Sequence, residues 1–249
     1  MIRSRLAHEF ILSPNLGPRR EGRKVDMLLL HYTGMDSARA ARDWLCNPES
    51  GVSCHYLVDE DGHITQMVDE GMRAWHAGRS SWQGESDTNS RSVGIEIHNP
   101  GHRLGYCPFP PIQMDAVISL CQDILTRHAI PPWLVLAHSD VAPERKLDPG
   151  ELFDWRLLHA SGIGHWVEPA PIMAGARLGP GEEGEAVLRL QAMLAQYGYG
   201  IELTGNYDHQ TLTVVAAFQR HFRPETVDGH ADYSTKDTLD RLLAGLAGA

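Results

Sequence analysis

Apolar and polar positions along the chain form five short stretches that each predict a β-strand. Residues 27–33 (MLLLHYT) and 133–139 (WLVLAHS) contain continuous apolar runs, which are typical of strands buried on both faces. Residues 92–98 (SVGIEIH) alternate between apolar and polar side chains. The stretches 54–59 and 63–68 are separated by Glu-Asp-Gly, and the Asp-Gly turn signal predicts that they pair as a hairpin.

Two segments between these strands have a helical period. Apolar side chains recur every three or four residues in 110–129, and Pro111 suits a first helical turn. Residues 36–46 (DSARAARDWLC) predict a shorter helix capped by Asp36. Because helices and buried strands interleave, the fold class is α/β, with a mixed central β-sheet flanked by helices.

The pattern changes towards the C-terminus. Residues 168–184 are dense in Pro, Gly and Ala without a helix or strand period, which indicates a linker. Residues 185–249 contain three helical patterns, the last starting at the capping-box-like STKD of 234–237. We therefore expect one domain over 1–167 and a small all-α three-helix domain over 185–249, each with its own core.

The charge and the apolar runs exclude several classes of protein. The net charge is −10, divided equally between the parts before and after residue 177, so no basic surface for nucleic acid is expected. No run approaches the roughly 18 to 20 apolar residues of a membrane helix. The first residues lack the apolar run of a secretory signal, which predicts a cytoplasmic protein; the alternative is the cell envelope by an unrecognised export route.

The four cysteines are expected to be free thiols. Cys46, Cys54, Cys107 and Cys121 show no CxxC spacing, and cytosolic disulfides are rare. A disulfide between Cys46 and Cys54 is the alternative.

Three side chains at or after the ends of predicted strands form a candidate metal centre. His31 ends the first buried run, His138 ends the last one, and Asp148 lies in the loop that follows. Catalytic zinc commonly takes three protein ligands and keeps a fourth position open for water. Since strand ends converge at one edge of an α/β sheet, these three residues can meet there.

Each candidate also has an ordinary structural interpretation. A single histidine at a strand end is more often a surface or hydrogen-bonded core residue, and Asp148 can simply begin a turn with the proline that follows. Glu96, between two isoleucines, either points to solvent or lies in a cleft with a raised pKa. Lys146 by itself is a typical solvated loop lysine.

Four stretches together resemble the zinc-dependent N-acetylmuramoyl-L-alanine amidases, a family that includes phage lysozyme-type amidases and animal peptidoglycan recognition proteins. In chain order they are LLLHYTG, VSCHYLVDEDGHITQMV, AWHAGRSSWQG with NSRSVGIEIHNPG, and AHSDVAPERKLDPGELFDW. The resemblance spans roughly residues 25–160 and is greatest to the bacterial branch that cuts or recycles muropeptides. It implies that His31, His138 and Asp148 bind one zinc ion. It also implies that Glu96 and Lys146 are catalytic.

The resemblance further implies which residues contact the substrate. His76, Trp75 and Asn89 fall in segments that line the muropeptide cleft in the family. Some branches carry a catalytic tyrosine at the position of Cys54 in this chain. The general-base role therefore falls to Glu96, and Cys54 is expected to have no chemical role.

The implied reaction is hydrolysis of the amide between the lactyl group of N-acetylmuramic acid and the first L-alanine of the stem peptide. Glu96 would take a proton from water and return it to the leaving nitrogen, while Lys146, helped by His76, would stabilise the oxyanion. Two alternatives stay open: a protein that only binds peptidoglycan, and a zinc peptidase that cuts within the stem peptide. The sequence also leaves open whether the muramyl sugar of the substrate is the anhydro or the ordinary form, and whether the substrate is polymeric wall or soluble fragments. It does not indicate the stem-peptide preference or the oligomeric state.

The C-terminal part resembles a three-helix peptidoglycan-binding domain. Its marks are GEEGEAVLRLQAMLAQYGY, TGNYDHQTLTVVAAFQRHF and VDGHADYSTKDTL. We expect a separable anchor: deleting 178–249 should weaken binding to sacculi and leave hydrolysis of a short muropeptide nearly intact. A helical bundle used for dimerisation is the alternative.

Overall fold

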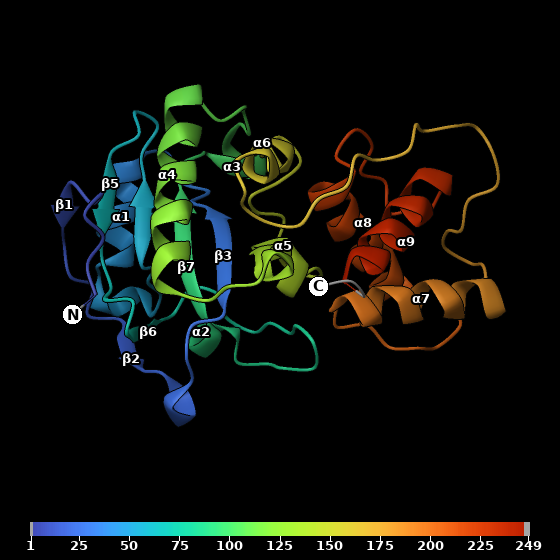
Figure 1. The fold of residues 1–249 in the computed structure, drawn as a ribbon, viewed down its shortest axis with the longest axis horizontal. Coiled ribbons are helices and arrows are strands. Elements are labelled where there is room, and N and C mark those ends of the chain that lie inside the picture. The colour runs from blue at the N-terminus through green and yellow to red at the C-terminus, as the bar shows by residue number, and fades with distance from the viewer. Residues whose placement is uncertain (1, 247–249) are drawn as a thin grey trace.

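The computed structural model describes residues 2–246, in which a mixed β-sheet lies beside a group of three helices (Figure 1). The six-stranded sheet has the order β1-β5-β4-β7-β3-β8. β4 and β5 pair antiparallel as the predicted hairpin, whereas the other neighbouring strands run parallel. Strands β2 and β6 form a small antiparallel pair of their own. The strands are β1 Glu9–Phe10, β2 Leu16–Pro18, β3 Met27–Tyr32, β4 Tyr56–Val58, β5 Ile64–Gln66, β6 Met72–Ala74, β7 Ser92–Ile97 and β8 Val135–Ala137.

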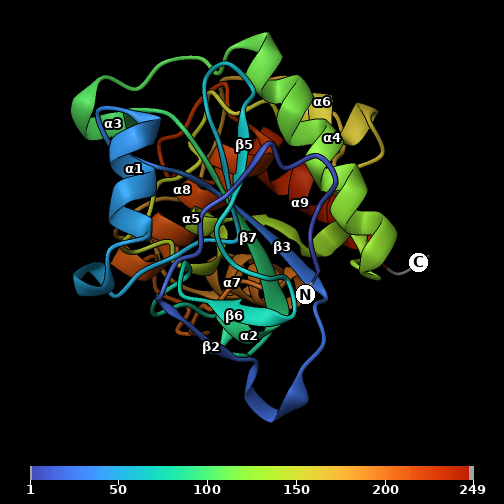
Figure 2. The same cartoon turned by 90° about the vertical axis from the view of Figure 1, so that its left-hand side faces the viewer.

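Helices cover both faces of the sheet. Viewed from the side, α1 lies against one face and α4 against the other (Figure 2). The helices of this part are α1 Ala38–Leu45, α2 Thr88–Arg91, α3 Gly101–Leu104, α4 Pro111–Arg127, α5 His138–Val141 and α6 Trp155–Ala160, with short 3₁₀ turns at Arg20–Gly22, Pro48–Ser50 and Pro132–Leu134. The α/β class predicted from the alternating patterns is confirmed.

The buried side chains explain why these elements form. Residues 27–30 of β3 are fully buried, as expected for a central strand covered on both faces. On α4, the side chains at helical spacing that were predicted to face the core are also buried, among them Val117, Leu120 and Ile124. Removing this apolar surface from water stabilises the layered arrangement.

Two predicted helix starts are wrong by one or two residues. The N-cap of α1 is Ser37 rather than Asp36, because the Ser37 hydroxyl accepts the Ala40 N–H at 3.1 Å. The last helix, α9, begins at Tyr233 before the predicted STKD box, and the Asp232 carboxylate accepts the Thr235 N–H at 2.7 Å. In both cases an equally good capping oxygen lies one or two residues from the one chosen from the sequence.

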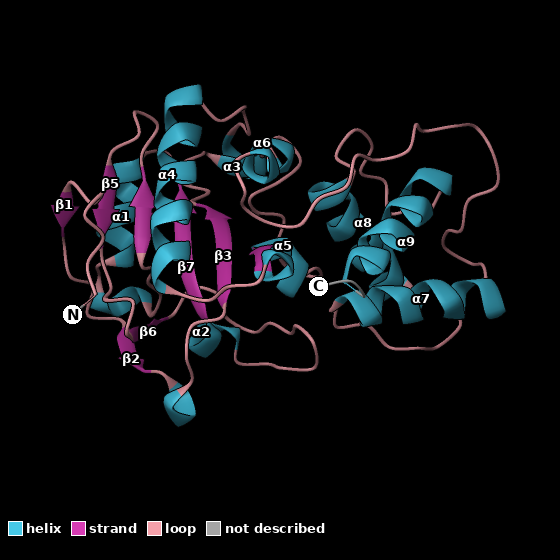
Figure 3. Cartoon of the chain, in the orientation of Figure 1, coloured by secondary structure: helices cyan, strands magenta, loops and turns pink. Residues whose placement is uncertain are grey.

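The C-terminal part is all helical, with α7 Glu185–Tyr197, α8 His209–Phe222 and α9 Tyr233–Leu246 (Figure 3). Residues 161–184 contain no named helix or strand. The buried side chains of α7–α9 belong to the same continuous apolar cluster as those of the sheet, so the two parts are packed together. Within 2–246, no helix combines the length and apolar character that a membrane span needs. All four cysteines are free thiols, as predicted.

Candidate metal centre and active site

The ends of parallel strands bring the candidate residues to one edge of the sheet. His31 is the penultimate residue of β3, and His138 directly follows β8, the neighbouring strand. In the register of β3 and β7, His31 is paired with Glu96. Paired residues of adjacent strands project from the same face of a sheet, so the pairing places Glu96 beside His31.

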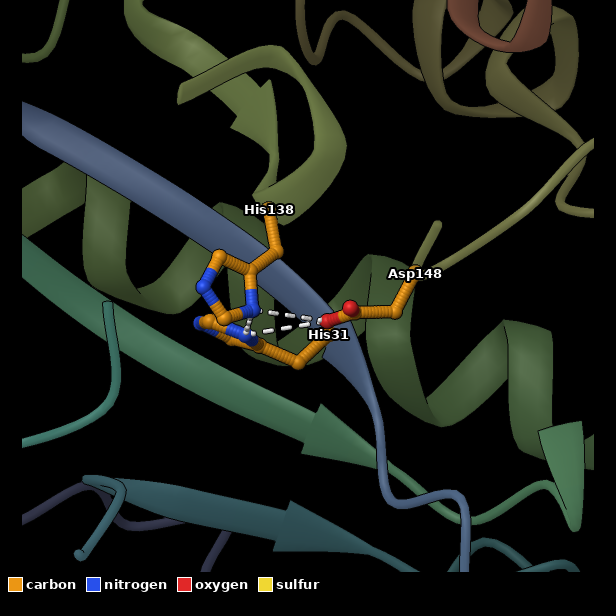
Figure 4. A group of neighbouring side chains, drawn as sticks. All are labelled: His31, His138 and Asp148. Atoms are coloured by element: carbon orange, nitrogen blue, oxygen red, sulfur yellow. Dashed lines mark hydrogen bonds and ion pairs between the residues drawn. The ribbon is translucent and has the colours of Figure 1, made fainter. Parts of the chain in front are cut away.

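His31, His138 and Asp148 point towards one another (Figure 4). The two Nδ1 atoms are 2.8 Å apart, and Asp148 Oδ2 lies 3.2 Å from His31 Nδ1 and 3.0 Å from His138 Nδ1. All three side chains are buried, and they form a group that could hold a metal ion. The structure thus brings His31 to two residues that follow it by 107 and 117 positions in the chain.

Hydrogen bonds among Ser92, His76 and His31 determine which ring nitrogen of His31 carries the proton. The Ser92 hydroxyl donates to Thr88 O at 2.7 Å, so its oxygen accepts from His76 Nε2 at 3.2 Å. His76 Nδ1 is then an acceptor for His31 Nε2, 3.0 Å away. The proton of His31 therefore resides on Nε2, which leaves Nδ1 as a free lone pair.

The same argument applies to His138. Its Nε2 lies 3.0 Å from the carbonyl oxygen of Ala77, which can only accept, and 3.4 Å from Arg145 Nη2; the shorter contact favours a proton on Nε2. Two ring lone pairs and one carboxylate oxygen consequently face each other at hydrogen-bond distance. Three electron-rich atoms at such separations repel one another unless a cation lies between them.

Zinc fits this donor set. Imidazole nitrogen and carboxylate oxygen are common zinc ligands, and bonds of about 2.0–2.2 Å place tetrahedral ligand atoms roughly 3.3 Å apart. The observed separations of 2.8, 3.0 and 3.2 Å are near that value. Metal-bound histidines commonly donate the other ring nitrogen to a protein acceptor, as both histidines do here.

The protonation states suit metal binding as well. Burial, with the neighbouring His138, lowers the pKa of His31 to about 4, so this ring is neutral at pH 7. An aspartate carboxyl group ordinarily has a pKa of about 4, so the Asp148 side chain binds as a carboxylate at pH 7. Neutral imidazole and ionised carboxylate are the forms that bind a metal.

A cavity of about 250 Å³ adjoins the group of candidate ligands. Its lining includes two of them, His138 and Asp148, together with Glu96 and Lys146. Most of the remaining lining was not predicted from the sequence: Tyr32, Thr33, Met35, Ala41, Trp44, Leu45, Val52 and Ser53. Trp44 is 47% exposed on α1, and an exposed aromatic side chain on an amphipathic helix was the available signal.

The Glu96 carboxyl group has an unpaired oxygen and a shifted pKa. Its Oε2 is shielded from solvent and has no hydrogen-bond partner within the described part of the chain. Burial raises the pKa of Glu96 well above its ordinary value, and the Asp148 carboxylate raises it further, while Lys146 opposes the shift. A carboxylate with a raised pKa is a stronger base, which suits general-base catalysis near neutral pH.

Of the three predicted substrate contacts, His76 borders the cavity whereas Trp75 and Asn89 do not. His76 borders the cavity, but its ring nitrogens are used by His31 and Ser92. Asn89 Oδ1 accepts the N–H groups of residues 76 and 77, at 3.1 and 2.9 Å. The Trp75 ring lies towards Gly17 of β2. Neither Trp75 nor Asn89 lines the described cavity, and Asn89 instead holds the backbone of the segment that carries His76.

Comparisons with known proteins match two parts of the chain to known families. The profile of the N-acetylmuramoyl-L-alanine amidase family matches residues 21–151, and that of a putative peptidoglycan binding domain matches residues 183–239. The chain is 37% identical over 237 residues to the N-acetylmuramoyl-L-alanine amidase AmiD of Escherichia coli K12, covering 88% of this chain and 83% of that protein.

Solved structures are similar over nearly the whole chain. The complex of E. coli AmiD with the substrate anhydro-N-acetylmuramic acid-L-Ala-D-γ-Glu-L-Lys has a TM-score of 0.77 at 35% identity, covering 92% of this chain and 90% of the other. AmpDh3 of Pseudomonas aeruginosa in complex with anhydromuramic pentapeptide has a TM-score of 0.74 at 28% identity, covering 91% and 94%.

Fold, site and comparisons together define a hydrolase that carries its candidate metal centre at the edge of a mixed α/β sheet. The chain belongs to the N-acetylmuramoyl-L-alanine amidase family.

Proposed function

We propose that the chain hydrolyses the amide bond between N-acetylmuramic acid and L-alanine in muropeptides, using one zinc ion held by His31, His138 and Asp148. The observation that carries this proposal is the convergence of two ring lone pairs and a carboxylate oxygen beside a cavity that also contains Glu96. The two similar structures with bound muropeptides support wall fragments as the substrate class.

Zinc at this centre would supply Lewis acidity, which acidifies water and polarises a carbonyl oxygen. Glu96 takes the proton from the attacking water and returns it to the leaving alanine nitrogen, a role that typically contributes 10²–10⁴-fold. The Lys146 ammonium group balances the negative charge that develops on the carbonyl oxygen. Loss of such a contact commonly raises the activation free energy by about 3–4 kcal/mol.

The C-terminal helices add a second binding function to this proposal. The match of residues 183–239 to a putative peptidoglycan binding domain supports retention on polymeric wall. Retention would raise the effective concentration of the catalytic site near its substrate.

The variant Glu96→Gln tests the proposal. Since the amide cannot take up the proton, hydrolysis of a soluble anhydromuropeptide should fall by about 10²–10⁴-fold while the zinc content stays unchanged. The matched control is Glu144→Gln, an exposed carboxylate on the loop near Lys146, which should keep the original rate. Product release followed by mass spectrometry and zinc content by elemental analysis give the two readouts.

Product masses and chelation separate the alternatives. The proposal requires an intact sugar and a peptide that begins with alanine, and it requires the reaction to stop with a chelator and resume with zinc. Cleavage within the stem peptide would identify a zinc peptidase, and tight binding without any product would identify a binding protein. An unchanged rate for Glu96→Gln would disprove the assigned base.

A further inference from the structure

A carboxylate two residues after His138 connects the candidate metal centre to the C-terminal helices. Asp140 is fully buried. Its Oδ2 accepts the Ala137 N–H at 2.8 Å and the His221 Nδ1–H at 2.6 Å, and its Oδ1 accepts the Tyr199 hydroxyl at 2.7 Å. Two of these three donors therefore come from the C-terminal part, while the third belongs to the backbone just before His138.

The imidazole of His221 is held in one orientation. It stacks on Trp155, with ring centroids 3.7 Å apart, and on Phe222, with centroids 3.8 Å apart. The side chain is buried. Because a carboxylate only accepts hydrogen bonds, the proton of the contacting nitrogen points at Asp140. The stacked ring is thus a preformed donor.

The same turn of α8 also approaches the other ligand-bearing segment. Arg220 Nε lies 3.9 Å from a carboxylate oxygen of Glu151, which is three residues beyond Asp148. The two ligand segments are themselves tied together, since the Ser139 N–H donates to Asp148 O at 3.0 Å. The end of α8 consequently contacts both segments that present metal ligands, as its place next to α5 in Figure 1 indicates.

We propose that Tyr199 and His221 are positioning residues of the metal centre, which act through Asp140 on the segment that carries His138. The proposal rests on the proposed zinc site. In this view the C-terminal helices hold the ligand geometry in addition to binding wall polymer. Removing them would then impair hydrolysis of small soluble muropeptides, in contrast to the separable anchor expected from the sequence.

The expected effect follows from the burial of Asp140. A buried carboxylate that loses a donor must move towards another partner or towards water. Because α5 is a single turn that starts at His138, such a movement shifts the His138 ring. Changes to groups that orient metal ligands typically reduce metal affinity by 10–100-fold.

The test compares full-length variants that each alter one donor. His221→Leu removes the imidazole donor, Tyr199→Phe removes the hydroxyl, and His221→Asn restores an N–H near the position of Nδ1. The matched control is Tyr197→Phe, since that hydroxyl contacts His165 at 3.0 Å in the same helical part without touching Asp140. Zinc affinity is measured by competition with a fluorescent chelator, and kcat and KM are measured on a soluble anhydromuropeptide.

We expect His221→Leu to weaken zinc binding by about 10–100-fold and Tyr199→Phe to weaken it by less, while circular dichroism stays unchanged. His221→Asn should recover part of the loss, and Tyr197→Phe should bind zinc like the parent protein. Parental zinc affinity in folded His221→Leu and Tyr199→Phe would overturn the proposal, as would an equal loss in Tyr197→Phe. Failure of the zinc site itself is distinguishable, because His31→Ala would then leave zinc affinity unchanged.

Discussion

Buried carboxylates in this molecule differ in their partners, and the partners indicate their roles. Asp148 faces two ring nitrogens. Asp140 is saturated by an amide, a hydroxyl and an imidazole. Glu96 keeps an oxygen without a partner among the described residues. Since buried polar atoms are nearly always hydrogen-bonded, an unpaired oxygen beside a cavity points to a reacting group or a water as its missing partner.

Glu70 provides the clearest pH-dependent contribution to stability. It is fully buried, and Arg127 and His128 contact its two oxygens at 2.6 and 2.7 Å. Burial alone would raise its pKa, but the hydrogen bonds from His128, Arg127 and Tyr56 lower it to about 2 from an ordinary value of 4.5. Because the folded-state pKa is depressed, this contribution is present above about pH 5 and is lost as the pH falls towards 2.

We therefore predict that Glu70→Gln lowers the free energy of unfolding by about 3 kcal/mol at pH 6 and by much less at pH 3. Urea denaturation of both proteins at pH 6, 4 and 3 measures the difference. The exposed Glu49→Gln serves as control and should show no such pH dependence. An equal penalty for Glu70→Gln at all three pH values would contradict the assignment.

At the scale of elements, strand β7 shows how a glycine makes room for the candidate metal centre. A Cβ at Gly94 would lie 2.6 Å from the ring of His76, which supports His31. The Gly94 N–H also donates to His55 Nδ1 at 3.0 Å. The close approach of the His76 ring to the strand thus depends on the missing side chain.

Gly94→Ala should accordingly displace His76 and its hydrogen bond to His31. We expect a loss of about 1–3 kcal/mol in unfolding free energy and roughly tenfold weaker zinc binding. Gly17→Ala on β2 is the matched control, since its Cβ would meet nothing closer than 3.9 Å. Chemical denaturation and chelator competition provide the measurements, and parental zinc affinity in Gly94→Ala would show that His76 does not support His31.

The elements also show which parts of the fold and site the sequence could predict. Strands β3 and β7 and helix α4 are long enough for the apolar period to be read. Strands β1, β2 and β6 have two or three residues, and they lack the signals that revealed the equally short β4, β5 and β8, namely an Asp-Gly hairpin turn or a longer apolar run. His31, His138 and Asp148 were predictable because each follows a recognisable strand or turn. The contacts of Asp140 were not, because they depend on how α8 packs.

At the scale of the whole molecule, the catalytic and helical parts share one buried interface built around Trp82. This side chain is 0% exposed, and its ring lies 4.9 Å from that of Tyr199. Gly198 allows the contact, since a Cβ there would lie 2.5 Å from the indole. The Gln83 N–H donates to Gly198 O at 2.8 Å, where the loop before α2 extends towards α7 (Figure 1). Such an interface couples the unfolding of the two parts.

We predict that the parent protein unfolds in one cooperative transition and that Trp82→Ala separates it into two. The substitution removes a large buried side chain, which typically lowers the free energy of unfolding by about 3–5 kcal/mol, and this loss weakens the interface that joins the two parts.

Differential scanning calorimetry measures the number of transitions and compares calorimetric with van't Hoff enthalpies. Trp44→Ala is the control: it also removes one tryptophan, but from an exposed position on α1, so its transition should stay single. Two well-separated transitions in the parent protein would show that the helices unfold independently, and a single transition at unchanged temperature in Trp82→Ala would show that this interface does not couple them.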